Sequence, residues 1–352
     1  MEKRTYELTF LTPAFLGDAE QNARWRTPPI KHLLRAWWRV AWAQDHDFKT
    51  DHRAIQEMRT AEGNLFGNAW LSDEEGGNRK SRLRMRLDTW DIGKLRKWDS
   101  HAEQRVYHPE VGAGGNGMQV GAELYLGFGP LTNKGGTNLK ANAAIQAGES
   151  ATLRLALPSN EVSRIDRTMQ WIDRFGNLGG RSRNGWGAIC LRENQTSWGK
   201  DMSLPLRPWA KALRAEWPHA VGTDDAGPLI WQTTVQTNWH ALMQTLAAIK
   251  IGFRTQLPFT TGHGAERPEE RHWLSYPVTN HSVRGWGNLR LPNSLRFTAC
   301  QDAQGQLRGV IYHMPIRPPA DFRPDDQALH SAWSAVHRYL DKQCQGLDRI
   351  KE

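Results

Sequence analysis

Hydrophobic residues recur every three or four positions between Thr27 and Trp42, which is the spacing of one face of an α-helix. Thr27 can cap the start of such a helix, and Pro28 and Pro29 suit its first turn. The pattern therefore predicts an amphipathic helix over residues 27–42. Its apolar stripe consists of Ile30, Leu33, Leu34, Trp37 and Ala41.

The remaining face of this predicted helix is basic. Lys31, Arg35 and Arg39 occupy positions i, i+4 and i+8, and no carboxylate occurs from residue 23 to residue 43. A helix on an ordinary surface interleaves Glu with Lys or Arg, because such pairs stabilise it. An unpartnered basic stripe suits phosphates, and indoles beside it suit stacked bases. The alternative is a solvated helix whose tryptophans pack inward. The residues that border the stripe are His32, Trp38 and Trp42.

Two stretches alternate between polar and apolar residues with the period of a β-strand. In residues 5–11, Tyr6, Leu8 and Phe10 fall on one side. In residues 82–87 the polar positions are all arginine, and such like charges repel each other unless an anion lies across them. The alternative is an edge strand whose charges discourage pairing with other chains. The arginines are Arg82, Arg84 and Arg86.

A glycine-rich segment, residues 176–187, lies between a predicted helix over 161–175 and a predicted strand. Five of its twelve residues are glycine. Glycine lets backbone N–H groups approach a ligand closely, and arginine and indole side chains contact phosphate and base. The alternative is a long connector whose glycines only turn the chain. The candidate ligand-binding residues here are Arg181, Arg183, Asn184 and Trp186.

The predicted elements of the first half follow the order strand, helix, strand, strand, helix, strand, with one extra strand in the middle. This is the order of a ferredoxin-like (split βαβ) unit, so we expect an α+β protein whose N-terminal domain spans 1–198. A segment rich in Pro, Trp and Gly, 199–227, is the predicted linker. The C-terminal domain, 228–352, is predicted to repeat this order of strands and helices more loosely, and Asp325 is the predicted cap of its last helix. Because no strand clearly follows that helix, we expect this domain to be incomplete or permuted.

The composition favours an acidic partner. The chain has 46 Lys and Arg against 37 Asp and Glu, a formal net charge of +9, which suits nucleic acid or an anionic surface. No run approaches the roughly 18 apolar residues of a membrane helix, so we expect no membrane insertion. The three cysteines lie far apart and form no Cys-x-x-Cys motif. They favour a reducing compartment, the cytoplasm, and argue against a structural zinc site.

Four blocks of the sequence are similar to motifs of one protein family: Thr12–Gly17, Arg26–Arg39, Asn64–Gly67 and Gly179–Gly187. They resemble the RAMP superfamily of CRISPR effector proteins, and within it the first-named subunit of the type III-B (Cmr) complex. The resemblance implies two ferredoxin-like (RRM-like) RAMP domains and assembly with other RAMP subunits of a type III CRISPR effector complex. It also implies contact with guide RNA and target RNA at the end of their duplex, in antiviral defence, and no catalysis. In two departures, His32 replaces the family's usual glycine and Asn184 stands where a second arginine is common.

The alternatives to this function differ in the role of His32. No His-Glu-x-x-His, paired cysteine or dense carboxylate cluster occurs, so we expect no metal and no cofactor. His32, beside Lys31, could act as a general acid or base in RNA cleavage. The protein would then be a metal-independent endonuclease that processes CRISPR RNA precursors. A phosphate or base contact is the other role for His32. A free-standing binder of single strands is the third possible function.

Overall fold

The structure, a computed structural model, describes residues 1–69, 78–193 and 203–351. The chain divides into two compact units, each built from several segments. The first unit consists of residues 1–98, 129–205 and 298–306, and the second of residues 99–128, 206–297 and 307–352.

The predicted linker, 199–227, contains regular structure. Its residues 199–202 lie outside the described residues, as does the predicted domain end at residue 198. The boundary between the two units, after Pro205, falls within this segment. From there on the segment forms β9 (Leu206–Pro208), α5 (Trp209–Ala212) and β10 (Val221–Asp224), and β9 and β10 belong to a small sheet with β11 (Gly227–Pro228).

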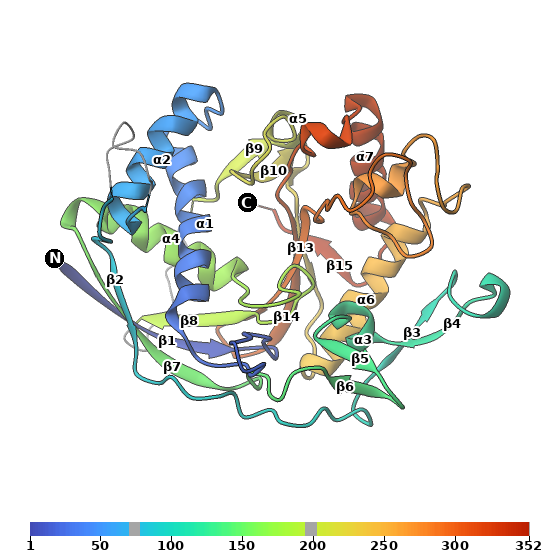
Figure 1. The fold of residues 1–352 in the computed structure, drawn as a ribbon, viewed down its shortest axis with the longest axis horizontal. Helices are drawn as coiled ribbons and strands as arrows, with labels where there is room; N and C mark the ends of the chain where they lie inside the picture. Colours follow the sequence, from blue (N-terminus) through green and yellow to red (C-terminus); the bar gives the residue numbers. More distant parts are fainter. Residues whose placement is uncertain (70–77, 194–202, 352) are drawn as a thin grey trace. The chain divides into compact units, whose positions relative to one another are not determined.

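A four-stranded antiparallel sheet is the centre of the first unit (Figure 1). In spatial order its strands are β2 (Arg84–Leu87), β7 (Ser150–Leu157), β1 (Glu2–Phe10) and β8 (Ile189–Glu193). The helices of this unit are α1 (Thr27–Asp45), α2 (His52–Phe66) and α4 (Val162–Phe175). Along the chain the order is strand, two helices, two strands, helix and strand, with a small hairpin, β5 (Leu131–Asn133) and β6 (Thr137–Leu139), inserted before β7.

One face of this sheet packs against α1 and α4. The alternation predicted for β1 is confirmed, since Tyr6, Leu8 and Phe10 are all fully buried. Because side chains alternate along a strand, the polar positions lie on the opposite face of the sheet. Apolar side chains from the four strands and both helices meet in one core, which includes Leu8, Ile30, Met85, Leu153, Met169 and Leu191.

The start of α1 differs from the prediction. Thr27 is its first helical residue, and Arg26 occupies the capping position with extended backbone and no capping hydrogen bond from its side chain. Pro28 lies in the first turn, as expected, where its missing N–H costs no intrahelical hydrogen bond. The two prolines, rather than a threonine cap, therefore define this end of the helix.

The second unit is built around another four-stranded sheet. In spatial order its strands are β13 (Leu295–Gln301), β14 (Leu307–His313), β12 (Ile230–Thr233) and β15 (Leu347–Arg349). Residues 298–301 of β13 belong to the first unit in the division given above. Its long helices are α6 (Trp239–Thr255) and α7 (Asp326–Lys342), and Asp325 caps α7 as predicted, its side chain accepting from the N–H of Ala328. The inserted elements are β3 (Arg105–His108), β4 (Met118–Gly121) and α3 (Ala122–Gly127).

The expectation that this second domain is incomplete or permuted is wrong. A strand, β15, does follow α7, and it pairs antiparallel with β12. Along the chain the unit therefore reads strand, helix, strand, strand, helix, strand, and its sheet has the same order as that of the first unit. Three residues are too few to show a strand period in the sequence, so pairing with β12 defines β15. Among the described residues, no helix has the length and hydropathy that crossing a membrane requires.

Candidate functional site

The basic face of α1 meets a buried carboxylate from the next helix. Glu62 on α2 accepts hydrogen bonds at 2.9 Å from Arg35 Nε and from Nε and Nη2 of Arg39. The side chain of Glu62 is 5% exposed, whereas those of Arg35 and Arg39 are 38% and 41% exposed. The expectation that these cations lack a carboxylate partner is therefore wrong. The partner is supplied by the fold from another helix, so the helix's own sequence could not reveal it.

An open cleft of about 600 Å³ lies beside this ion pair. On its wall Lys31 Nζ donates a hydrogen bond to the carbonyl oxygen of Phe66 at 2.8 Å. Burial, together with the charge of Arg35, lowers the pKa of Lys31. Arginine forms paired hydrogen bonds to phosphate oxygens and lysine attracts them as a point charge, so the cleft suits an anion. Four cations and one carboxylate line it: Lys31, Arg35, Arg59, Arg79 and Glu62.

Beyond α2, an isolated antiparallel bridge between Asn68 and Arg79 places Arg79 in the lining of the cleft. Gly67 has a φ of +81°, and a Cβ there would lie 2.8 Å from the backbone nitrogen of Ser81 and 2.9 Å from the carbonyl oxygen of Arg79. Asn68 and Arg79 then exchange two backbone hydrogen bonds of 3.1 Å. Only glycine fits this close approach without strain. The close approach of this backbone thus explains why the Asn64–Gly67 block ends in glycine.

The sequence analysis did not identify three of the residues that line the cleft: Arg59, Glu62 and Arg79. Arg59 and Glu62 lie on α2, whose sequence has no distinctive motif. Arg79 is the first residue of a basic stretch, and that stretch is the one feature of the sequence that could have indicated a role for Arg79 in binding. Their convergence with Lys31 and Arg35 depends on how α2 packs against α1.

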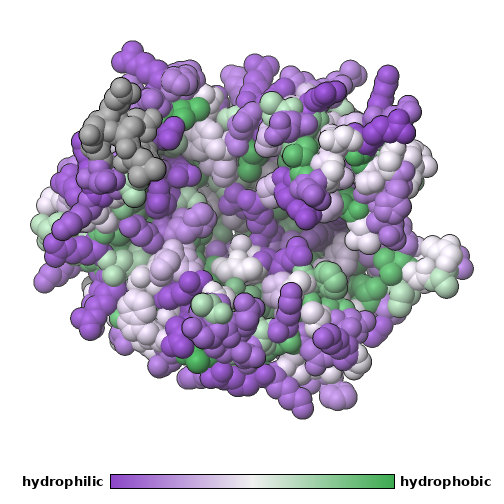
Figure 2. Space-filling model, viewed as in Figure 1, coloured by the Kyte–Doolittle hydropathy of each residue, from purple (hydrophilic) through white to green (hydrophobic). Residues whose placement is uncertain are grey.

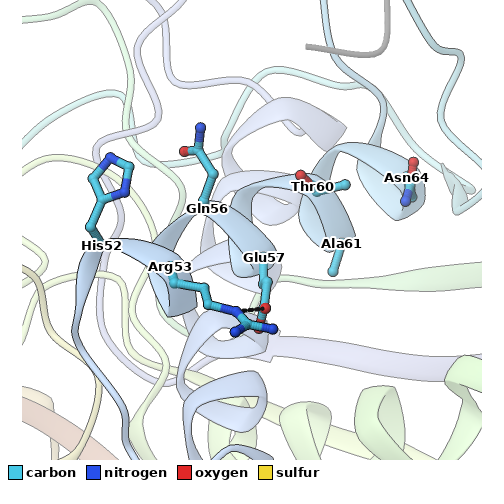
Figure 3. A pocket seen from close by; sticks show the side chains of 7 residues that line it. All are labelled: His52, Arg53, Gln56, Glu57, Thr60, Ala61 and Asn64. Atoms are coloured by element: carbon cyan, nitrogen blue, oxygen red, sulfur yellow. Dashed lines mark hydrogen bonds and ion pairs between the residues drawn. The ribbon is translucent and has the colours of Figure 1, made fainter.

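A second hollow, of about 570 Å³, lies along the outer face of α2, whose surroundings are mostly hydrophilic (Figure 2). Figure 3 shows that all its side chains come from this single helix, His52 at one end and Asn64 at the other. Its one cation, Arg53, already pairs with Glu57 at 2.9 Å. Because no second element faces α2 here, this hollow lacks the convergent cations of the cleft.

The indoles expected to stack on bases are buried instead. Trp38, Trp42 and Trp186 are 0%, 3% and 0% exposed. Trp38 Nε1 donates to Glu161 at 3.3 Å, and the ring of Trp42 stacks on His46 with centroids 3.7 Å apart. A base cannot reach any of the three, so the stacking hypothesis is wrong for them. For Trp38 and Trp42 the inward-packed alternative is correct.

The glycine-rich segment, 176–187, is fastened to the chain that follows β1. Thr12 Oγ1 donates to the carbonyl oxygen of Gly185 at 2.8 Å, in a buried contact. Gly187 has a φ of +66°, and a Cβ there would lie 1.9 Å from the carbonyl oxygen of Leu178. Close packing of backbone on backbone therefore explains these glycines without a ligand, as the connector alternative proposes.

The polar residues of this segment form a turn at its surface. Arg181 is exposed, Arg183 and Asn184 are half-buried, and the N–H of Asn184 donates to the carbonyl oxygen of Arg181 at 2.8 Å. No residue of the segment lines the cleft. The structure thus brings Lys31, Arg35 and Arg39 together around Glu62, while Arg181, Arg183 and Asn184 form a separate group.

The side chain of His32 is exposed on α1, outside the set of residues that line the cleft. No histidine, cysteine or carboxylate side chains gather in threes, as a metal site would require, within residues 1–69, 78–193 and 203–351. The described groups of the cleft can hold an anion by charge and hydrogen bonds. Among the described residues that line it, the positively charged donors are Lys and Arg, and arginine does not exchange protons at neutral pH.

Comparison with known proteins gives one family. The RAMP superfamily model matches residues 7–190, a segment that contains α1, α2, the cleft and the glycine-rich loop. No curated protein matches the chain.

Solved structures with a similar chain path are distant in sequence. The apo crystal structure of Cmr1 from Pyrococcus furiosus is 14% identical, with a TM-score of 0.47, and the match covers 99% of this chain and 98% of that one. A chain in the cryo-EM structure of the type III-B Cmr-beta complex bound to cognate target RNA is 11% identical, with a TM-score of 0.44 and coverage of 96% and 100%. A chain of a type IV-B CRISPR complex is 13% identical, with a TM-score of 0.30 and coverage of 59% and 95%.

Proposed function

We propose that this chain, which belongs to the RAMP superfamily, is an RNA-binding subunit of a type III CRISPR ribonucleoprotein effector complex. In this proposal it contacts guide RNA and target RNA at the end of their duplex, assembles with other RAMP subunits, and serves antiviral defence without catalysis. Its family membership and the four blocks that resemble the Cmr subunit support the assignment. Cys190 and Cys344 are free thiols, which suits the reducing cytoplasm.

The main support for RNA binding is the basic cleft, which is lined by α1, α2 and residues that follow α2. Among the described residues, four cations from three segments converge there on an open space, and a single carboxylate offsets them. Arg59 and Arg79 are exposed, so their guanidinium groups can reach a phosphate without opening the core. Because the described lining of the cleft includes no exposed aromatic ring, the proposed contact is with the RNA backbone rather than with its bases.

The fold that we propose for both units is the ferredoxin-like arrangement of RAMP domains. In each sheet the second, third, first and fourth strands along the chain lie in that spatial order. In the first unit α1 and α2 lie between the first strand and the second, and α4 lies between the third and the fourth; in the second unit α6 and α7 take these places. This connectivity supports two such domains, the first comprising most of residues 1–198 and the second most of 228–352.

Salt dependence of RNA binding tests the cleft. Each phosphate neutralised on a single strand contributes about 0.7 to the slope of log K against log[salt], so the double change Arg59→Gln and Arg79→Gln should reduce the slope by about 1.4. The measurement is fluorescence anisotropy of a labelled oligouridylate at several salt concentrations. Arg53→Gln is the matched control: it removes the same charge from the outer face of α2, where Arg53 pairs with Glu57. An unchanged slope in the folded double variant would remove the cleft from the RNA site.

The absence of catalysis has its own test. Metal-free RNA cleavage needs one group to accept the 2′-hydroxyl proton and another to protonate the leaving oxygen. His32 is the single histidine of α1, which leaves that helix without a second histidine to carry the other proton. Labelled guide precursor and target RNA, incubated with the protein in EDTA and then in magnesium, should stay intact. Cleavage that His32→Ala abolishes would overturn the proposal in favour of an endonuclease.

A further inference from the structure

A row of arginines covers part of the sheet face that lies opposite α1 and α4. Arg82 precedes β2, and Arg84 and Arg86 lie on it; all three are exposed, while Leu83 and Leu87 between and beside them are 3% and 1% exposed. Arg154, also exposed, is the direct partner of Arg86 on the neighbouring strand β7. We infer that this arginine face, Arg82, Arg84, Arg86 and Arg154, is a second phosphate-binding surface that carries the backbone of single-stranded RNA.

The pairing of Arg86 with Arg154 is the central observation. Like charges directly opposite each other on an antiparallel pair destabilise it. Elsewhere on the same sheet face the cross-strand partners are complementary: Glu7 of β1 lies opposite Arg192 of β8. In the part of the chain that the structure describes, none of the four guanidinium groups of the arginine face makes an ion pair or a hydrogen bond. The free protein therefore holds these charges together without a direct ion pair, which favours an anionic ligand.

Protection of a sheet edge explains only part of this arrangement. β2 is an edge strand, and charges on an edge discourage pairing with other chains. Arg154, however, lies on β7, which has β2 on one side and β1 on the other. A charge on an interior strand protects no edge. The like-charge pair thus needs a reason beyond solubility.

One carboxylate lies near the arginine face and is already engaged. Asp88 follows β2, and its Oδ1 accepts the backbone N–H of Thr152 at 2.8 Å. Burial opposes ionisation of Asp88, but the hydrogen bonds from Thr152 and the charge of Arg154 prevail and lower its pKa. Asp88 therefore stays ionised and offsets one of the four positive charges. The face keeps a net positive charge.

The geometry favours a nucleic-acid backbone over an acidic protein segment. Alternate residues on a strand are about 6.6 Å apart, a repeat comparable with that of phosphates along an extended single strand. The outward positions of β2 and β7 carry no aromatic residue, so bases would find no stacking platform there. Contact through phosphates alone makes binding independent of sequence and strongly dependent on salt. This inference goes beyond the proposed function, because none of the four arginines lines the cleft.

The test compares a triple variant, Arg84→Gln, Arg86→Gln and Arg154→Gln, with the control Arg192→Gln, which removes a cation that faces Glu7 on the same sheet. With a labelled oligouridylate, the triple variant should reduce the salt slope by about 2, since three phosphates contribute about 0.7 each; the control should leave it unchanged. The same loss is expected when the cleft already carries Arg59→Gln and Arg79→Gln. A failure of the cleft and a failure of the arginine face are therefore distinguishable.

A second measurement, the melting temperature of the protein without RNA, tests the repulsion between the arginines independently of RNA binding. Without RNA, the single change Arg86→Gln should raise the melting temperature at low salt, because it removes the repulsion from Arg154, and added salt should shrink the gain. A salt slope equal to that of the unaltered protein in the folded triple variant would overturn the inference. So would a polyglutamate of matched charge that competes as well as the RNA, because the surface would then fit an acidic protein segment.

Discussion

Replacing Glu62 by glutamine should weaken the fold and strengthen RNA binding at the same time. Glu62 joins α2 to α1 through three hydrogen bonds to Arg35 and Arg39. The same two arginines supply positive charge at or beside the cleft, so the carboxylate competes with any phosphate for them. Glutamine keeps the size of the side chain and removes its charge, which separates electrostatics from packing.

The size of the expected loss of stability depends on how exposed Glu62 and its two arginine partners are. Exposed ion pairs contribute about 0.2–1 kcal/mol, and breaking a fully buried pair costs about 3–5 kcal/mol because a charge is left without compensation. Here the carboxylate is 5% exposed, but the arginine side chains are 38% and 41% exposed and regain water when it is lost. We therefore expect the free energy of unfolding to fall by roughly 1–2 kcal/mol, between the two limits. Each arginine that becomes free for a phosphate adds about 0.7 to the salt slope.

Two assays on the same protein decide the outcome. Urea unfolding followed by circular dichroism measures the loss of stability, and anisotropy of a labelled oligouridylate measures the gain in affinity. The control is Glu57→Gln, which removes an exposed carboxylate of α2 whose partner Arg53 faces away from the cleft; both quantities should stay nearly constant. If Glu62→Gln lowers stability while RNA affinity stays constant or falls, the cations of α1 serve the helix pair and not the RNA.

Two further predictions concern the fold around the site and the second unit. Gly67→Ala should destabilise the protein by more than about 1 kcal/mol, because its φ of +81° and the backbone of Ser81 at 2.8 Å leave no room for a Cβ; Gly17→Ala, where a Cβ meets nothing within 4 Å, is the control in urea unfolding. In the second unit, burial lowers the pKa of His337 to about 3 and that of its hydrogen-bonded neighbour His313 well below its usual value. The unfolded chain, with a histidine pKa near 6.5, then binds more protons than the folded one between about pH 3 and pH 6.5. Stability is thus complete above about pH 6.5 and falls as the pH falls, by roughly 2 kcal/mol at pH 5 for His337 alone, and urea unfolding at pH 8 and pH 5 should show this difference.

Local patterns were sufficient where the neighbours in the sequence determine the structure. The period-two alternation of β1 and of residues 82–87 gave the correct buried and exposed sides, since alternation follows from strand geometry alone. Asp325 could be recognised as a cap because its side chain bonds a backbone N–H three residues further on. The start of α1 was predicted with Thr27 as the cap, whereas Arg26 occupies the capping position and Thr27 is the first helical residue.

Features that depend on long-range packing could not be predicted. Glu62 lies 23 residues from Arg39, and no pattern in either helix links the two. The burial of Trp42 and Trp186 depends on which elements cover them, and an indole beside a basic stripe looks the same in sequence whether it faces RNA or the core. β15 exists because β12 offers it an edge, which three residues cannot reveal. The site that the sequence indicated, the basic face of α1, is thus only one wall of the cleft.

The two basic surfaces of the first unit should contribute differently to RNA binding, because among the described residues only the cations of the cleft form a direct ion pair with a carboxylate. In the cleft, Glu62 already accepts a hydrogen bond of 2.9 Å from Arg35 Nε, and its negative charge weakens the attraction of Arg35 for a phosphate. On the arginine face, a phosphate displaces solvent and mobile ions and also relieves the repulsion between Arg86 and Arg154. The loss of affinity per arginine removed should therefore be larger on the arginine face than at Arg35. The cleft, where a carboxylate already holds Arg35 by a hydrogen bond, is the better placed of the two to select the geometry of its ligand.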